Sequence, residues 1–386
     1  MKRFVFYNPT KIVFGKHETE NIGAYIKESP CLLLYGKGSI KQNGIYDRVV
    51  NSLKKNNIRF IELGGVKSNP VLSFVYSAIE IVKKEKLNSI LAVGGGSVID
   101  TAKAISAGAM YNGDVWDFFI DKARIENALP IYTVLTLSAT ASEMNSGAVI
   151  TNEKTQQKFN INATVLFPRV SVLDPVNTYT VSKEYTAYGC VDAIVHLLEG
   201  YFTQEDPHTP IQDSFVESLI KTLMESTREI LNNPQDYEAR ANFMWSATLA
   251  LNGLTTAGIG RYGFPNHMMG HSLSALYDTP HGASLSIVLI GWLKYQIQLG
   301  NYKKIAQLGK AVFGITGNNE ELSAKDTVKA FADFFTFIGS PITLQQLNIP
   351  HSDIDKIASN AVMLAEKWGL NAYTQSVIKD IFKLCY

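Results

Sequence analysis

Cysteine is scarce in this chain. Its 386 residues include three cysteines, Cys31, Cys190 and Cys385, which lie far apart and form no CxxC pair. An odd, scattered set of this kind argues against a disulfide framework and against a zinc site made of thiolates. A metal ion in this protein would therefore need oxygen and nitrogen ligands.

An excess of charge of one sign is also missing. Lysine and arginine together number 36, aspartate and glutamate 35, and no long run of one charge occurs. This balance gives no electrostatic footprint for nucleic acid or for an anionic membrane. We expect neither as a partner and favour a small-molecule ligand.

Long apolar runs are absent too. The N-terminal MKRFVFYNPTKIVFG is too interrupted for the apolar core of a signal peptide, and the later ASLSIVLIGWL is too short to span a membrane. We therefore expect a cytoplasmic protein with no membrane partner.

The apolar residues that are present predict two domains of different class. Up to about residue 180, short apolar runs such as PCLLLYG and SILAVGGG alternate with amphipathic segments such as VLSFVYSAIEIVKKEK. This alternation is typical of a parallel sheet with helices on both faces. After Ser182 the segments are long and helical in period. We predict an α/β nucleotide-binding domain over residues 1–180 and an all-helical domain over residues 181–386.

The segment LAVGGGSVIDTAKAI contains a glycine loop between a strand and a helix. Gly94, Gly95, Gly96 and Ser97 allow the backbone to approach a phosphate, whose charge free N–H groups and a helix N-terminus attract. The spacing matches neither GxGxxG nor GxxxxGK[ST]. We predict a diphosphate site here, and the alternative is a tight turn without a ligand.

A second loop, YGKGS, follows the earlier strand. NAD-specific enzymes usually place a carboxylate at the end of such a strand, where it binds the ribose 2′-hydroxyl and repels a 2′-phosphate. Here the residues are Gly36, Lys37, Gly38 and Ser39. We predict a preference for NADP(H) over NAD(H), with Lys37 and Ser39 at the 2′-phosphate. The alternative is a surface lysine in a glycine turn.

Three of the seven histidines lie in NHMMGHSLSALYDTPHG, as His267, His271 and His281. Asp192 and His196 are four residues apart in CVDAIVHLLEG and share a helix face, as His267 and His271 do. One carboxylate with several imidazoles suits one divalent ion, Fe²⁺ or Zn²⁺. Spacing does not decide which three of the four histidines coordinate, and helical geometry alone favours His267 with His271. The alternative is a set of buried histidines without metal, in which Asp192 fixes a tautomer of His196.

Together these segments closely resemble the iron-containing (group III) alcohol dehydrogenases, and among them the NAD(P)H-dependent butanol dehydrogenases and aldehyde reductases. The resemblance runs nearly end to end through YGKGSIKQNGIYDRV, AVGGGSVIDTAKAI, LTLSATASEMNSGAVIT, SVLDPVNTYT, YGCVDAIVHLLEGY and HMMGHSLSALYDTPHG. It implies the dehydroquinate synthase-like fold, with an N-terminal α/β dinucleotide-binding domain and an all-helical C-terminal domain that holds the metal. A homodimer is the family expectation.

The resemblance also implies the site residues. The metal ligands are Asp192, His196, His267 and His281, while His271 lies beside the nicotinamide and is not a principal ligand, which differs from the choice that helical spacing favours. Ala141 stands where many members have glycine, and Lys103 lies on the helix that the glycine loop starts. Besides His271, the expected cofactor residues are Gly36, Lys37, Gly38, Ser39, Asn69, Gly94, Gly95, Gly96, Ser97, Asp100, Thr136, Leu137, Ser138, Thr140, Ser142 and Lys158.

The implied reaction is reversible hydride transfer between NAD(P)H and short or medium aliphatic aldehydes such as butanal, which yields primary alcohols. The metal, held in part by His267, acts as a Lewis acid, and His271 or a bound water relays the proton. The residues beside these motifs that are candidates either for the substrate pocket or for plain core are Met144, Asn145, Leu254 and Phe264.

Four other functions compete with this one. A polyol dehydrogenase of the same fold would oxidise glycerol or a diol with NAD, and a lyase of the same fold would use NAD only transiently. A metal-dependent hydrolase would have no use for the second glycine loop, and a binding module without activity would leave the acid and histidine set unexplained.

Overall fold

All residues, 1–386, are described by a computed structural model, in which the chain forms two compact units. The α/β unit comprises Tyr7–Val181 and Pro234–Asn252, and the helical unit comprises Met1–Phe6, Ser182–Asn233 and Gly253–Tyr386. Neither unit is one continuous stretch of sequence, so the predicted division at residue 180 stays a prediction. The predicted fold class, a parallel-sheet α/β part followed by a helical part, is confirmed.

The α/β unit contains a six-stranded sheet in which every neighbouring pair of strands is parallel. Its order is β1-β8-β5-β4-β2-β3, and β6 and β7 form a separate antiparallel pair. The strands are β1 (Lys11–Phe14), β2 (Cys31–Tyr35), β3 (Phe60–Leu63), β4 (Ser89–Gly94), β5 (Ile131–Leu135), β6 (Gly147–Asn152), β7 (Gln157–Asn162) and β8 (Val170–Leu173).

The strand order reverses beside β2. From β2 the chain moves outward to β3 and then returns across β2 to β4 and β5. In open parallel sheets, ligands bind beyond the carboxyl ends of the strands at such a reversal. Both glycine loops lie at this place, because one follows β2 and the other follows β4.

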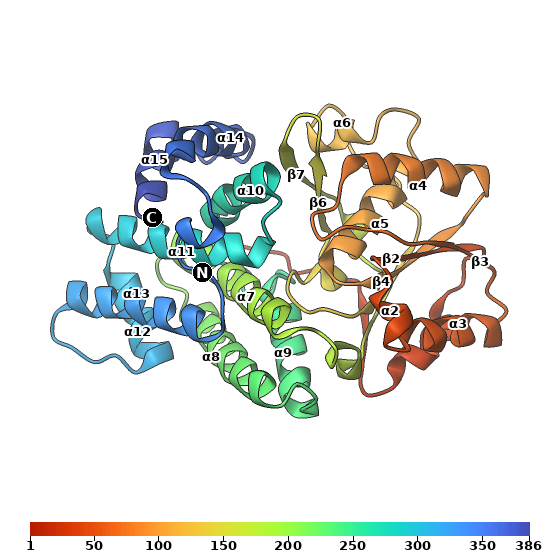
Figure 1. Cartoon of the computed structure of the whole chain (residues 1–386), viewed down its shortest axis with the longest axis horizontal. Helices are drawn as coiled ribbons and strands as arrows, with labels where there is room; N and C mark the ends of the chain where they lie inside the picture. The colour runs from red at the N-terminus through yellow and green to blue at the C-terminus, as the bar shows by residue number, and fades with distance from the viewer. The chain divides into compact units, whose positions relative to one another are not determined.

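Helices cover both faces of this sheet, with α4 and α5 on one face and α2 and α3 on the other (Figure 1). Both faces are therefore shielded from water, which explains why β2, β4 and β5 are buried at every position and are mostly apolar. The helices of this unit are α1 (Ile22–Tyr25), α2 (Ser39–Gln42), α3 (Ile45–Lys55), α4 (Leu72–Lys84), α5 (Gly96–Ala109), α6 (Trp116–Phe119) and α9 (Tyr237–Ala250).

The helical unit contains no strand, as the sequence predicts. Its central helix, α7, is capped by Ser182, whose hydroxyl accepts a hydrogen bond from the backbone N–H of Tyr185. Helix α10 starts with Pro265, whose missing N–H costs nothing in the first turn. The helices are α7 (Lys183–Thr203), α8 (Pro210–Asn232), α10 (Pro265–Tyr277), α11 (His281–Gln298), α12 (Lys303–Phe313), α13 (Glu320–Phe337), α14 (Ile354–Lys367) and α15 (Gln375–Lys383).

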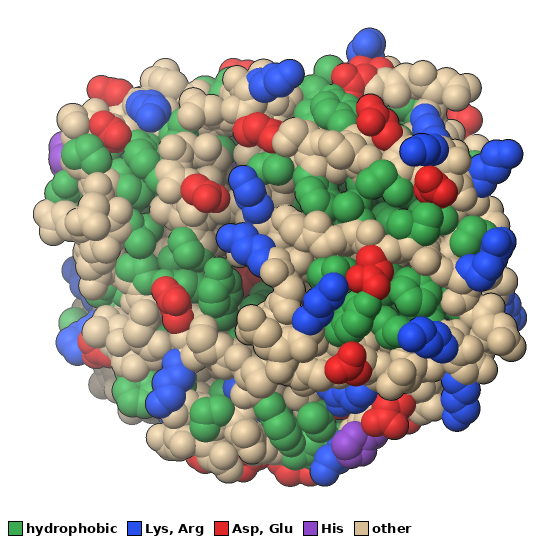
Figure 2. Space-filling model, turned by 45° about the vertical axis from the view of Figure 1, so that its right-hand side comes forward, with side chains coloured by type: hydrophobic (Ala, Val, Ile, Leu, Met, Phe, Trp, Pro, Cys, Tyr) green, Lys and Arg blue, Asp and Glu red, His purple; other side chains and the backbone are tan.

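The face of the molecule shown in Figure 2 has no obvious zone of one charge. On the face shown in Figure 2, lysine and arginine side chains alternate with aspartate and glutamate, as the even composition leads one to expect. None of the helices combines the length and the apolar character that crossing a membrane requires.

Candidate active site

Asp192 lies within a buried cluster of imidazoles in the helical unit. Its Oδ1 is 3.4 Å from His196 Nδ1, 3.5 Å from His267 Nε2 and 3.7 Å from His281 Nε2. One ligand atom from each of Asp192, His267 and His281 lies within 4.8 Å of the others. The fold thus brings together a carboxylate and imidazoles from segments up to 89 residues apart in sequence.

Three helices supply these side chains. Asp192 and His196 are one turn apart on α7, so they project from the same face. His267 lies in the first turn of α10, and His281 is the first residue of α11. The packing of α7 against α10 and α11 therefore builds the cluster.

His196 and His271 both lie beside the three-residue group, so the choice between them that spacing left open is not decided by this group. The ring of His196 stacks on that of His267 with centroids 4.3 Å apart, but His196 is outside the three-residue group. The ring of His271 lies 5.3 Å from that of His281 and is likewise outside the group. His271 is thus a neighbour of the cluster, and the ligand role of His196 stays a prediction.

The environment moves the pKa values of two of these histidines in opposite directions. Burial lowers the pKa of His196 to about 3, so this imidazole is neutral. Burial also opposes the charged form of His267, but the carboxylates of Asp192 and Glu199 outweigh it and raise the pKa of His267 to about 9. A positive charge at the centre of the cluster is therefore stabilised by carboxylates.

These residues fit a divalent ion. In a tetrahedral site with bonds of about 2.0–2.2 Å, neighbouring ligand atoms are about 3.3–3.6 Å apart, close to the separations around Asp192. The buried Nδ1 of His196 and Nε2 of His267 have no hydrogen-bond partner. Buried nitrogens of this kind need a partner, and a metal ion bound by all of these residues would provide one.

Sequence reasoning missed Glu199, a buried carboxylate on α7. Its Oε1 lies 3.0 Å from His267 Nδ1, on the side of the ring opposite to Asp192. The spacing carried a signal, because Glu199 comes seven residues after Asp192 and three after His196, on the same helix face.

Two aromatic side chains lie beside the histidines. The ring of Phe264 lies 5.7 Å from that of His267, and the ring of Trp368 lies 5.7 Å from that of His271. Phe264 and Trp368 also contact each other edge-on at 6.2 Å. Phe264 was a predicted pocket candidate, whereas Trp368, about a hundred residues further along the chain, carried no sequence signal.

The first glycine loop is packed tightly in the α/β unit. Gly94 ends β4, Gly95 precedes α5, and a Cβ on Gly96 would come within 2.3 Å of the Thr140 hydroxyl oxygen. A Cβ on Gly95 would come within 3.1 Å of Leu137. The structure therefore places the predicted diphosphate loop against the predicted nicotinamide-side segment.

That segment includes a departure from the family pattern, Ala141, where many members have glycine. Ala141 adopts φ 52° and ψ 19°, in the left-handed region where glycine is favoured, and its side chain is buried. The alanine therefore keeps the backbone that a glycine would give and accepts some strain. Next to it, the hydroxyl of Ser142 donates to Asp100 Oδ1 at 2.6 Å.

Lys103 stabilises this part of the chain through hydrogen bonds. Its ammonium group is fully buried and donates hydrogen bonds of 2.7–3.0 Å to oxygens of Ser142, Asn145 and Gly147. Burial lowers the pKa of Lys103 to about 8, an effect that Asp100 and Glu143 oppose. Asn145, a predicted pocket candidate, is thus used within the protein as a partner of Lys103.

The remaining cofactor residues occupy two places. Lys158 on β7 donates to Asn69 Oδ1 at 3.0 Å, which brings two predicted residues together. In the YGKGS loop, Lys37 is exposed, and Gly38 has φ 112°. A carboxylate does exist on the adjacent strand β3, where Glu62 accepts hydrogen bonds from Tyr35, Tyr46 and Lys41.

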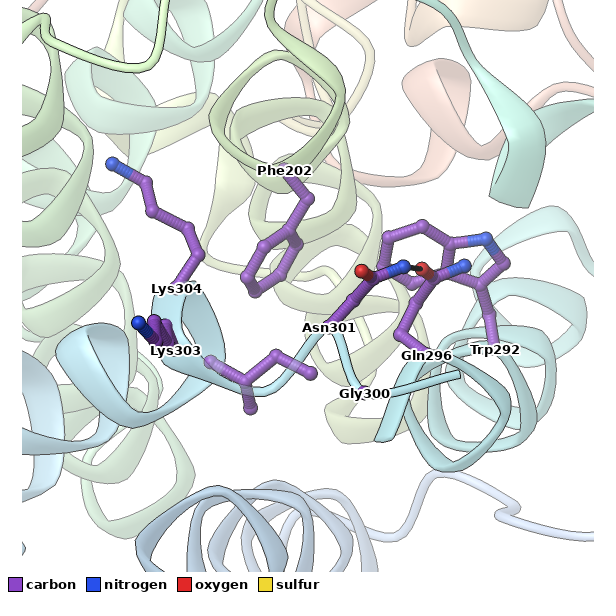
Figure 3. Close-up of a pocket in the computed structure, with 8 residues that line it drawn as sticks. Phe202, Trp292, Gln296, Gly300, Asn301, Lys303 and Lys304 are labelled. Atoms are coloured by element: carbon purple, nitrogen blue, oxygen red, sulfur yellow. Dashed lines mark hydrogen bonds between the residues drawn. The ribbon is translucent and has the colours of Figure 1, made fainter. Parts of the chain in front are cut away.

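The helical unit also contains a pocket that is lined by no histidine. It is a pocket of about 450 Å³ whose lining residues are Phe202, Trp292, Gln296, Gly300, Asn301, Lys303, Lys304 and Ile305 (Figure 3). Some of its polar side chains already have partners within the protein. Asn301 donates a hydrogen bond to Gln296, and Lys304 forms an ion pair with Asp213 outside the lining. It contains no carboxylate and no histidine, so it offers none of the chemistry of the Asp192 cluster.

Comparisons with known proteins give matches over nearly the whole chain. The family model for iron-containing alcohol dehydrogenase matches residues 9–175, and the model for the C-terminal part of this family matches residues 186–386. A probable NADH-dependent butanol dehydrogenase from Bacillus subtilis is 41% identical over 366 residues, which cover 94% of each chain. The NADPH-dependent aldehyde reductase YqhD of Escherichia coli is 37% identical over 92% of this chain and 91% of its own.

A solved structure is similar over the full length. The crystal structure of an NADH-dependent butanol dehydrogenase A from Thermotoga maritima superimposes with a TM-score of 0.94 at 48% identity, and it covers 100% of this chain and 99% of its own. With matches of this extent in sequence and in structure, the chain belongs to the iron-containing alcohol dehydrogenase family and is an oxidoreductase of alcohols and aldehydes.

Proposed function

We propose that this enzyme interconverts short or medium aliphatic aldehydes, such as butanal, and primary alcohols, using NAD(P)(H) and one divalent ion, Fe²⁺ or Zn²⁺. The observation that carries the proposal is the group formed by Asp192, His267 and His281, in which one carboxylate oxygen and two imidazole nitrogens lie within 4.8 Å of one another. His196 is the fourth proposed ligand, because its Nδ1 lies 3.4 Å from Asp192.

Each proposed residue has a task in this reaction. When bound, the nicotinamide supplies a hydride and the divalent ion supplies Lewis-acid chemistry. The N–H groups of Gly94–Ser97 and the N-terminus of α5 bind the diphosphate, while Thr136–Ser142 line the nicotinamide side. His271, beside the ligand His281, relays the proton between substrate oxygen and water.

The substrate class is supported by the surroundings of His267 and by relatives. Phe264 and Trp368 provide apolar surface beside the histidines and carry no charge that would bind an acid. The relatives named above are butanol dehydrogenases and an aldehyde reductase, whereas the 1,3-propanediol dehydrogenase of Citrobacter freundii is 28% identical. A diol dehydrogenase that uses NAD is therefore the second candidate.

The first test is butanal reduction before and after metal removal. We expect purified protein to lose at least about a hundred-fold in rate after exhaustive chelation, since Lewis-acid catalysis contributes several kcal/mol. Adding Zn²⁺, or Fe²⁺ without oxygen, should restore the rate, and Mg²⁺, which prefers oxygen ligands, should not. A rate indifferent to chelation would refute the proposal, and faster turnover of glycerol or a diol with NAD would favour the second candidate.

We also propose that NADPH is preferred over NADH. The loop after β2 presents Lys37 and Ser39 and no carboxylate, and the nearest carboxylate on β3, Glu62, is held by Lys41 and two tyrosines. A 2′-phosphate there would meet lysine side chains and an already paired acid. The named relatives include both NADH- and NADPH-dependent enzymes, so this chain's own residues carry the proposal.

Replacing Lys37 tests this preference. We expect Lys37→Ala to lower kcat/KM for NADPH roughly ten-fold, the value of one charge-assisted hydrogen bond, and to leave NADH unaffected. The matched control is Lys55→Ala, which removes another exposed lysine, the last residue of α3. Equal efficiency of the unmodified enzyme with the two nicotinamides would contradict the preference.

Two further parts of the proposal concern the protein as a whole. We propose a homodimer, the family expectation, which light scattering of the purified protein tests directly. We also propose a cytoplasmic location, which fractionation of cells that produce the protein would establish.

A further inference from the structure

We propose that Glu199 is a positioning residue of the metal site, which orients His267 so that its Nε2 faces the ion. The inference rests on the proposed metal site and concerns a residue outside the ligand set. It assigns a task to a buried carboxylate that the hydride-transfer chemistry does not itself use.

Both oxygens of Glu199 contact the start of α10. Oε1 accepts a hydrogen bond of 2.8 Å from the backbone N–H of His267 and lies 3.0 Å from Nδ1 of the same residue. Oε2 accepts a hydrogen bond of 3.1 Å from the side-chain amide of Asn266. The Glu199 side chain is completely buried, so water does not compete for these contacts.

The position of Glu199 on α7 explains how it reaches His267. Asp192, His196 and Glu199 follow one another at intervals of four and three residues, which aligns them on one helix face. The N–H of His267 is among the first of α10, which have no partner within their own helix. Glu199 satisfies this N–H and the imidazole together, and so fixes both the backbone and the ring of a proposed ligand.

This contact also selects the tautomer of His267. When His267 is neutral, as a metal ligand must be, the nitrogen that faces the Glu199 carboxylate at 3.0 Å keeps the hydrogen, so Nδ1–H points to Glu199 and Nε2 has the lone pair. Nε2 is the atom that lies 3.5 Å from Asp192 Oδ1. Histidine ligands are commonly held in this way by an outer carboxylate, whose loss lowers metal affinity by about 10- to 100-fold.

Two substitutions separate orientation from simple structural support. In Glu199→Gln, the amide oxygen still accepts from His267, and the NH₂ group can donate to a flipped Asn266, whose Oδ1 has no partner in the present arrangement. This variant should fold and lose only the charge, whereas Glu199→Ala loses the acceptor. The matched control is Asp213→Asn, a buried carboxylate on α8 that pairs with Lys304.

The measurement is the affinity of the full-length protein for Zn²⁺ in competition with a chelator, together with the visible spectrum of the Co²⁺-loaded protein. We expect Glu199→Ala to bind Zn²⁺ about 100-fold and Glu199→Gln about 10-fold more weakly, the two ends of the usual range. Both should change the Co²⁺ spectrum, which reports ligand geometry. Asp213→Asn should lower the melting temperature and leave affinity and spectrum unchanged.

The outcomes separate this inference from the proposed function. If the unmodified protein binds no Zn²⁺, the metal site itself is refuted. If the unmodified protein binds Zn²⁺ and Glu199→Gln has the same affinity and the same Co²⁺ spectrum, Glu199 is only a cap of α10 and the positioning role is wrong.

Discussion

Asp192→Ala is expected to abolish metal binding and to lower kcat/KM for butanal by about a thousand-fold or more, because the loss of Lewis-acid stabilisation costs several kcal/mol. Asp192 is the negatively charged member of the proposed ligand set, and its Oδ1 lies within 3.7 Å of nitrogens from three histidines. Without it, the remaining imidazoles would hold a divalent ion in a buried site with no opposite charge among the ligands. Metal analysis of the purified variant and its steady-state kinetics provide the check.

The informative control for Asp192→Ala is His271→Gln. His271 adjoins the cluster but lies outside the group of ligand atoms, so this variant should retain one metal equivalent per chain. It should turn over more slowly with an altered pH profile, because its proton relay is lost. An Asp192→Ala protein that keeps both its metal and its rate would refute the assignment of the site.

The glycine loops show what the sequence could predict. The loops that contain Lys37 and Gly96 both follow buried apolar strands, and strand order places these strands side by side. Short-range patterns were sufficient to place the loops. When glycine and then a helix directly follow a buried strand, the glycine marks the carboxyl end of that strand. The change to helical period after Ser182 likewise predicted the helical part of the fold.

Contacts between distant segments could not be predicted in the same way. Helical spacing paired His267 with His271, but the structure joins His267 to Asp192 and His281, because the turn before α11 returns His281 to the cluster. Trp368 reaches His271 only through the packing of α14 against α10. Local periodicity reports which face a residue occupies and does not report which segment packs against that face.

Lys103→Met is expected to have the largest effect of any change outside the metal cluster. The variant keeps an unbranched side chain, one heavy atom shorter, but leaves buried oxygens of Ser142, Asn145 and Gly147 without their donor. It also removes the positive charge of Lys103, which favours the ionised form of the buried Asp100 carboxyl group. Breaking such a buried set costs about 3–5 kcal/mol, since the groups left behind remain desolvated.

The loss should appear in cofactor binding as well as in stability. Ser142 and Asn145 border Ala141, whose left-handed backbone persists only while its surroundings hold it, so the segment Thr136–Ser142 should relax when Lys103 is gone. We expect a lower melting temperature and a raised KM for the nicotinamide. Lys83→Met, which removes an exposed lysine of α4, is the matched control and should change neither. A Lys103→Met protein with an unchanged melting temperature and an unchanged cofactor KM would contradict this prediction. The five hydrogen bonds of the Lys103 ammonium group would then contribute nothing to the cofactor segment, because the buried oxygens would have found other donors without any movement of that segment.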